Sequence, residues 1–208
     1  MRDNAVLILA LFVALFVTFA PAAALAKPKQ ARGASANATR LTPYVGLSGA
    51  GRSSIRGWGA DHYAGRLGGQ TGARIEAPLA RYFSLGGMAE FGGTSVRYAD
   101  RAELYLDFSL WAKGRYVFDF KPFDLEIYGG MPLGMSLGFV DFDRGYGREF
   151  GPGLNSGFLM GAQFLFKKGG FFTDLGPRFR RTWHRDGGAD WSYGGVRFAW
   201  NFGGVLYF

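Results

Sequence analysis

From about residue 41 onward, apolar and polar positions alternate along the chain with a period of two. In residues 103–120 the even positions are almost all apolar, from Leu104 to Phe120, whereas the odd positions include Asp107 and Lys113. Successive side chains of a β-strand point to opposite faces of the sheet. The pattern therefore predicts strands that each have one apolar and one polar or small face.

Eight segments of the chain follow this pattern. We predict strands at residues 41–50, 63–79, 82–97, 103–119, 123–140, 155–167, 170–184 and 191–208. Most of them reach the ~9–11 tilted residues that a strand needs to cross a bilayer, and bacterial membrane barrels have an even number of strands. Short connections at residues 80–81, 120–122 and 168–169 alternate with longer ones at 51–62, 98–102, 141–154 and 185–190. This alternation is typical of transmembrane barrels and predicts both termini on the short-turn side.

The first residues of the chain have the features of an export signal. Arg2 precedes an apolar run from Ala5 to Ala20, and Ala24-Leu25-Ala26 provides a small-x-small cleavage pattern. The run is shorter than the ~20 residues of a spanning helix, although an uncleaved N-terminal anchor remains an alternative. We therefore predict a signal peptide at residues 1–26, a flexible basic linker at 27–40 and a barrel at 41–208.

The last residues of the chain form a pattern that resembles a known signal. Asn201, Gly203, Leu206 and Phe208 read polar-x-Gly-x-x-hydrophobic-x-aromatic, with the aromatic residue last. This resembles the C-terminal signal that the outer-membrane assembly machinery recognises. Together with the eight alternating segments, it makes residues 41–208 similar to the small eight-stranded barrels of the OmpA and OmpX type. The resemblance implies an all-β fold, a single closed antiparallel up-and-down barrel, in contact with outer-membrane lipids. Members of this family serve in tethering, adhesion, small-solute passage or, in a few cases, lipid modification, so the resemblance does not define one function.

The predicted inner face carries balanced charge. Its positive residues are Arg66, Arg74, Lys113, Arg115, Arg178, Arg180 and Arg197, and its negative residues are Glu76, Glu90, Glu103, Asp107, Asp124, Glu126 and Asp174. A buried charge without a partner is costly, and an eight-stranded barrel has room only for side chains or one small ligand. We therefore predict a lumen plugged by ion pairs and a structural or interaction role. A narrow channel for small or apolar solutes is the alternative.

Composition, charge and the direction of the apolar face separate the barrel from other classes of protein. The chain has 34 glycines, 17% aromatic residues, no cysteine and a net charge of +8. The positive charges are spread along the strands, which argues against nucleic-acid binding. A soluble β-sandwich would alternate in the same way, but with its apolar face turned inward.

Candidate chemistry is sparse. The only histidines, His62 and His184, are predicted at the rim, and neither belongs to the His-x-Ser pattern of lipid A deacylases. A rim-located lipid A-modifying enzyme is thus a minor alternative, and we expect no catalysis. Three acidic residues in one predicted loop, Asp141, Asp143 and Glu149, match no metal-binding spacing. We expect neither a metal nor a cofactor.

Aromatic residues are predicted to form two belts at the membrane interfaces. Those near the long loops are Tyr98, Tyr146, Trp183 and Trp191, and those near the short turns are Phe118, Phe120, Phe123 and Phe171.

Overall fold

The computed structural model describes residues 38–208, apart from 57–60, 65–66, 97–100, 121, 143–147 and 187–188. Side chains are also left undescribed at residues 50, 55–56, 61–64, 95–96, 101–102, 141–142, 148–149, 186 and 189. The predicted signal peptide and nearly all of the predicted linker lie outside these ranges. No helix within them is long and apolar enough to cross a membrane.

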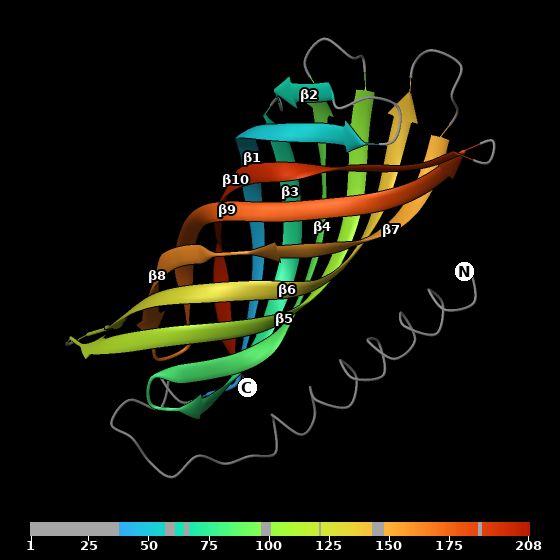
Figure 1. Cartoon of the computed structure of the whole chain (residues 1–208). Coiled ribbons are helices and arrows are strands. Elements are labelled where there is room, and N and C mark those ends of the chain that lie inside the picture. Colours follow the sequence, from blue (N-terminus) through green and yellow to red (C-terminus); the bar gives the residue numbers. More distant parts are fainter. Residues whose placement is uncertain are drawn as a thin grey trace.

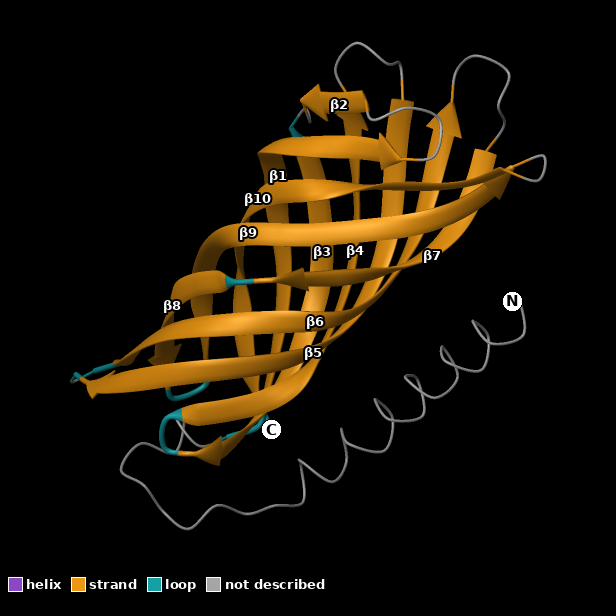
Figure 2. Cartoon of the chain, viewed as in Figure 1, coloured by secondary structure: helices purple, strands orange, loops and turns teal. Residues whose placement is uncertain are grey.

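The described residues form a closed antiparallel barrel (Figures 1 and 2). Its strands are β1 (Arg40–Arg56), β2 (Asp61–Ala64), β3 (Gly68–Ala80), β4 (Phe83–Val96), β5 (Arg101–Asp119), β6 (Asp124–Phe142), β7 (Arg148–Gly157), β8 (Leu159–Phe166), β9 (Gly169–Asp186) and β10 (Ala189–Tyr207). Strands β7 and β8 follow each other between β6 and β9, and β2 pairs only with the end of β1. The ring in the described part of the chain therefore has eight positions.

Closure of the ring joins the first strand to the last. Strand β1 pairs with β10 from Arg40↔Tyr207 to Arg56↔Ser192, with one bulge between Gly49 and Arg52. All other pairings around the ring are also antiparallel, and β6 and β9 each pair with both β7 and β8, which together fill one position. A closed ring leaves no unpaired sheet edge, because each strand has a partner on both sides. The predicted up-and-down barrel is confirmed.

The first long connection contains more strand than predicted. Residues 51–56 continue β1 beyond its bulge, where β1 stops pairing with β3 and pairs instead with the short β2. The predicted strand at 63–79 is therefore wrong at its start, because β3 begins at Gly68. The alternation of apolar and polar residues depends only on the local sequence. Which strand a segment pairs with depends also on how the neighbouring strands bend.

The sixth predicted strand also starts earlier than expected. β7 begins at Arg148, inside the segment that was predicted to be a loop until residue 154. Gly151, Pro152 and Gly153 are typical of a turn, yet they pair with β6. A Cβ atom at Gly153 would lie 2.1 Å from the carbonyl oxygen of Arg181, so glycine permits this close approach of β7 to β9.

The two faces of the strands point as predicted. Leu110 and Phe198 are 50% and 46% exposed on the outside, whereas their neighbours Ser109 and Arg197 are buried in the interior. This is the reverse of a soluble sandwich, in which the charged face points outward. The apolar outer face requires a nonaqueous environment, because contiguous apolar surface of this extent is rare on soluble monomers.

Aromatic side chains form a band near the short turns. Stacked, tilted or edge-to-face ring contacts link Tyr82 to Tyr116, Tyr116 to Phe118, Phe118 to Phe120, Phe120 to Phe123, Phe123 to Phe164 and Phe164 to Phe171. This band has the position predicted for one aromatic belt. At the other end Trp183 is 46% exposed, but Trp191 is buried in the lumen, so its predicted place in the outer belt is wrong. Tyr98 and Tyr146 lie outside the described residues.

Candidate functional site

The lumen holds most of the buried charge of the barrel. Its positive side chains are Arg40, Arg74, Lys113, Arg115, Arg178, Arg180 and Arg197, and its negative side chains are Glu76, Glu90, Glu103, Asp107, Asp124, Glu126 and Asp174. Seven positive charges thus face seven negative ones among the described residues. We group their contacts into three levels: a short-turn level around Glu126, a middle level around Asp174 and a long-loop level around Asp107.

At the short-turn level one carboxylate binds three cations. Arg40 and Lys113 donate hydrogen bonds to the two oxygens of Glu126 at 2.9 and 2.7 Å, and Arg115 donates to it at 3.2 Å. Lys113 also contacts Glu76, whose second oxygen accepts a hydrogen bond from the indole of Trp111 at 3.0 Å. Each carboxylate of this level therefore has more than one donor, as a buried charge requires.

At the middle level Arg74 forms an ion pair with Asp174. The same carboxylate accepts hydrogen bonds from Tyr128 Oη at 2.7 Å and from Asn201 Nδ2 at 2.9 Å. The guanidinium carbon of Arg74 lies 4.5 Å from the centroid of the Trp111 ring, within the range of a cation–π contact. Arg74 is therefore held between a carboxylate and an aromatic wall.

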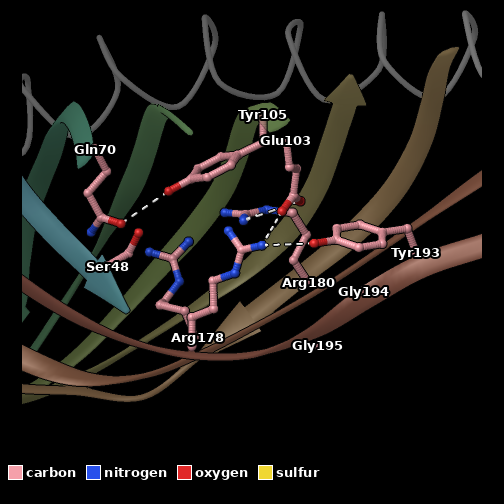
Figure 3. A pocket seen from close by; sticks show the side chains of 10 residues that line it. Ser48, Gln70, Glu103, Tyr105, Arg178, Arg180, Tyr193, Gly194 and Gly195 are labelled. Atoms are coloured by element: carbon pink, nitrogen blue, oxygen red, sulfur yellow. Dashed lines mark hydrogen bonds and ion pairs between the residues drawn. The ribbon is translucent and has the colours of Figure 1, made fainter. Parts of the chain in front are cut away.

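The long-loop level contains three arginines and three acids. Arg180 contacts Asp107 at 2.5 Å, and Arg178 contacts Glu90 at 3.2 Å. Arg197 pairs with Glu103. In Figure 3 the side chains of Arg178 and Arg180 extend from β9 into the lumen, and those of Glu103 and Tyr105 approach them from β5.

The lumen leaves almost no free space at this level. The cavity lined by Ser48, Gln70, Glu103, Tyr105, Arg178, Arg180 and Arg197, among others, has a volume of ≈ 10 Å³ accessible to water centres, which is room for about one water molecule. Ser48 Oγ, Arg178 Nε and Arg197 Nη1 are buried there without a protein hydrogen-bond partner. A water molecule would satisfy some of these groups, and nothing larger fits without movement of the side chains.

Several ion pairs reach across the whole width of the barrel. Arg40 of β1 and Glu126 of β6 lie four strands apart in both directions around the ring, as do Arg178 of β9 and Glu90 of β4. Arg197 of β10 and Glu103 of β5 have the same relationship. Because opposite walls meet at these contacts, the pairs block the lumen instead of lining an open bore.

The structure places most of the predicted lumen charges in these three levels. The predicted residues found there are Arg74, Glu76, Glu90, Glu103, Asp107, Lys113, Arg115, Glu126, Asp174, Arg178, Arg180 and Arg197. Asp124 is also buried, and Arg66 lies outside the described residues.

Sequence reasoning missed Arg40, which was assigned to the linker although β1 begins there. The inward positions Thr42 and Tyr44 continue back to Arg40 with a period of two, and this signal identifies it. The large buried side chains of Tyr105 and Trp111 were also missed, although they share the odd-numbered face of β5 with Glu103, Asp107 and Lys113.

Among the side chains that the structure describes, those at the long-loop rim form no recognisable catalytic group. His184 is buried and stacks on Trp191 with ring centroids 4.2 Å apart, so it is not an exposed rim residue. Its Nε2 lies 2.8 Å from Thr182 Oγ1. The side chains of His62, Asp141, Asp143 and Glu149 lie outside the described residues, within which no group of three or more metal-binding side chains is found.

The predicted assembly signal is divided between the two faces of β10. Asn201 is fully buried in the middle level, and Gly203 packs so closely against β1 that a Cβ atom would lie 2.0 Å from the carbonyl oxygen of Pro43. Leu206 and Phe208 are exposed on the outside, and the backbone N–H of Phe208 donates to Thr39 at 2.9 Å. The two apolar residues of the pattern are therefore accessible at the lip of the barrel.

Comparisons with known proteins identify the fold. No protein-family model and no curated protein matches the chain. Among solved structures, the outer membrane protein OprG of Pseudomonas aeruginosa aligns with a TM-score of 0.54 and 12% identity, over 86% of this chain and 99% of that one. Neisserial surface protein A aligns with a TM-score of 0.39 and 16% identity, over 85% and 100%, and Ail of Yersinia pestis with 0.34 and 12%, over 79% and 99%. At this identity the likeness to OprG establishes the fold alone, and the chain therefore has the fold of a small outer-membrane β-barrel.

Proposed function

We propose that this protein is a structural or interaction barrel of the outer membrane, with a lumen closed by ion pairs and with no catalytic activity. The observation that carries the proposal is the set of contacts between opposite walls, of which Arg40–Glu126 at 2.9 Å and Arg178–Glu90 at 3.2 Å are examples. An ion that entered would have to separate buried pairs at each level, which is costly in a narrow, poorly hydrated interior.

Three further features support an outer-membrane location. The barrel has an apolar outer face, connections of two to four residues at the end where its first and last strands begin and finish, and a fold like that of OprG. The N-terminal 26 residues act in this proposal as a cleaved export signal, and residues 27–39 as a basic linker. Asn201, Gly203, Leu206 and Phe208 would direct insertion by the barrel assembly machinery. The short turns then face the periplasm and the long connections face outward.

Electrical recording tests the closed lumen directly. Protein purified from membranes is added to planar bilayers, and its folded state is verified by heat-dependent migration in gels. We expect no current above that of protein-free bilayers. A reproducible stepwise conductance would contradict the proposal and favour a narrow channel.

A further inference from the structure

Two arginines point out of the barrel into its apolar surface. On β9, Arg181 lies between the inward-facing residues Arg180 and Thr182, so its own side chain faces outward. On β1, Arg52 adjoins the buried Ser53 and is exposed. On the outer face the nearest neighbours of Arg181 are Phe179 and Trp183 along β9 and Leu154 across on β7, and all three are exposed apolar residues. A charged side chain in such surroundings is costly unless it has a polar partner.

Both arginines lie near the outward end of the apolar surface. The outward-facing side chains of β9 begin with the exposed Phe171, close to a short turn. Arg181 follows ten residues later. With a rise of about 3.3 Å per residue and a tilt of about 40°, ten residues cover about 25 Å, which is the height of the apolar band of such barrels. Arg52 lies eleven residues after Leu41 on β1. Both residues therefore lie at the level of the outer-leaflet headgroups.

On the outer face of β10, the residues between the two arginines are Gly194, which has no side chain, and the exposed Val196. One strand, β10, separates them: Arg181 pairs with Gly194, and Arg52 pairs with Val196. The strands that carry the two arginines, β9 and β1, are thus about 10 Å apart. A Cβ atom at Gly194 would lie 3.0 Å from the Cβ atom of Arg181, so any side chain there would occupy the space beside that arginine. Among the side chains that the structure describes, no acid forms an ion pair with either arginine.

We infer that Arg52 and Arg181 bind the phosphate groups of a phosphorylated glycolipid of the outer leaflet, of the lipid A class. Guanidinium groups bind phosphate through paired, charge-assisted hydrogen bonds, and Gly194 leaves room for a headgroup between them. The outer leaflet is the source because the arginines lie at the long-connection end, whereas inner-leaflet phospholipids contact the short-turn end. The inference rests on the proposed membrane location and orientation.

Titration with defined lipids tests this site. The full chain in detergent micelles is titrated with diphosphorylated lipid A and with the same lipid after removal of its phosphates, and binding is followed by native mass spectrometry. We expect the phosphorylated form to bind more tightly. The double variant Arg52→Gln/Arg181→Gln should lose at least about tenfold in affinity for it and bind the dephosphorylated form unchanged. Arg181→Lys should retain part of the affinity, because it keeps the charge without the paired geometry.

Arg185 provides a matched control on the same strand and face. It is exposed and forms an ion pair with Asp190 at 3.3 Å, so Arg185→Gln should leave the affinity unchanged. An equal loss in this variant, or equal binding of both forms of the lipid, would overturn the inference. Equally tight binding of phosphatidylglycerol would overturn the assignment to a glycolipid. Bilayer current is a separate readout, so a conducting lumen would contradict the proposed function without affecting the lipid result.

Discussion

Arg40, the first residue of β1, donates a hydrogen bond of 2.9 Å to Glu126 on the opposite wall of the barrel. A second hydrogen bond, of 2.7 Å, links the same guanidinium nitrogen to Gln163 on β8. The residue at which the barrel begins therefore also closes its short-turn end. The first residue of the barrel thus takes part in the closed lumen on which the proposed function rests.

The middle level should be less tolerant of change than the short-turn level. Asp174 is the acid that pairs with Arg74 among the described residues, so Asp174→Asn should lower the free energy of unfolding by about 3–5 kcal/mol. Arg115→Leu should cost clearly less, because Glu126 keeps Arg40 and Lys113 as partners. Urea unfolding in lipid vesicles measures both. An equal effect of the two variants would contradict this assignment of pairs.

Removing one ion pair from the long-loop level should not open the lumen. In Arg197→Ala/Glu103→Ala one cross-lumen pair is lost without leaving an unpaired charge. We expect no added current in planar bilayers, because the middle and short-turn levels stay closed. A variant that also carries Arg40→Ala/Glu126→Ala provides the comparison. Conductance from the first variant alone would show that the long-loop level is the sole barrier.

Because Leu110 lies on the outward face of β5, a charged residue at this position should strongly destabilise the barrel. This residue lies near the middle of the exposed apolar series from Leu104 to Phe118. Leu110→Arg should destabilise the barrel in lipid by about 2–4 kcal/mol, since a charge at the midplane has no polar partner. Leu110→Ala, which adds no charge, is the control. Equal refolding of the two variants in vesicles would argue against a lipid-facing position.

Two glycines should respond in opposite ways to a methyl group. A Cβ atom at Gly130 would lie 2.1 Å from the ring of the fully buried Trp111, so Gly130→Ala should cost about 1–3 kcal/mol through overpacking. Gly69 has no atom within 4 Å of such a Cβ, and Gly69→Ala should be neutral or stabilise by up to about 1 kcal/mol. Unfolding midpoints of the two variants test this contrast.

The last residue should matter for assembly more than for stability. The side chain of Phe208 is 73% exposed, so Phe208→Ala should change the unfolding free energy little. The rate at which the Phe208→Ala variant inserts into vesicles that contain the purified assembly machinery should fall. The rate of its spontaneous refolding in detergent should not change. Asn201→Ala is the converse control, because this buried side chain bonds to Asp174. A matching loss in both assays for Phe208→Ala would contradict a role as a signal.

The sequence by itself determined the direction in which most side chains point. Leu110 and Ser109 are adjacent, and their alternation assigned one to the outside and the other to the lumen, as the structure has them. The balance of charges on the inner face follows from the same local rule, whereas the short turns were predicted from the lengths of the segments between strands. The directions of the side chains are predictable because consecutive side chains of a strand must alternate between its faces, whatever the strand pairs with.

The tertiary structure alone decided which of these residues meet. Arg40 and Glu126 are 86 residues apart and come together only through the tilt and stagger of all eight strands, which local alternation does not contain. The burial of His184 against Trp191 and the start of β7 at Arg148 depend on the same geometry. A one-residue shift in pairing anywhere around the ring would change every contact across the lumen, so partners become definite only when the barrel closes.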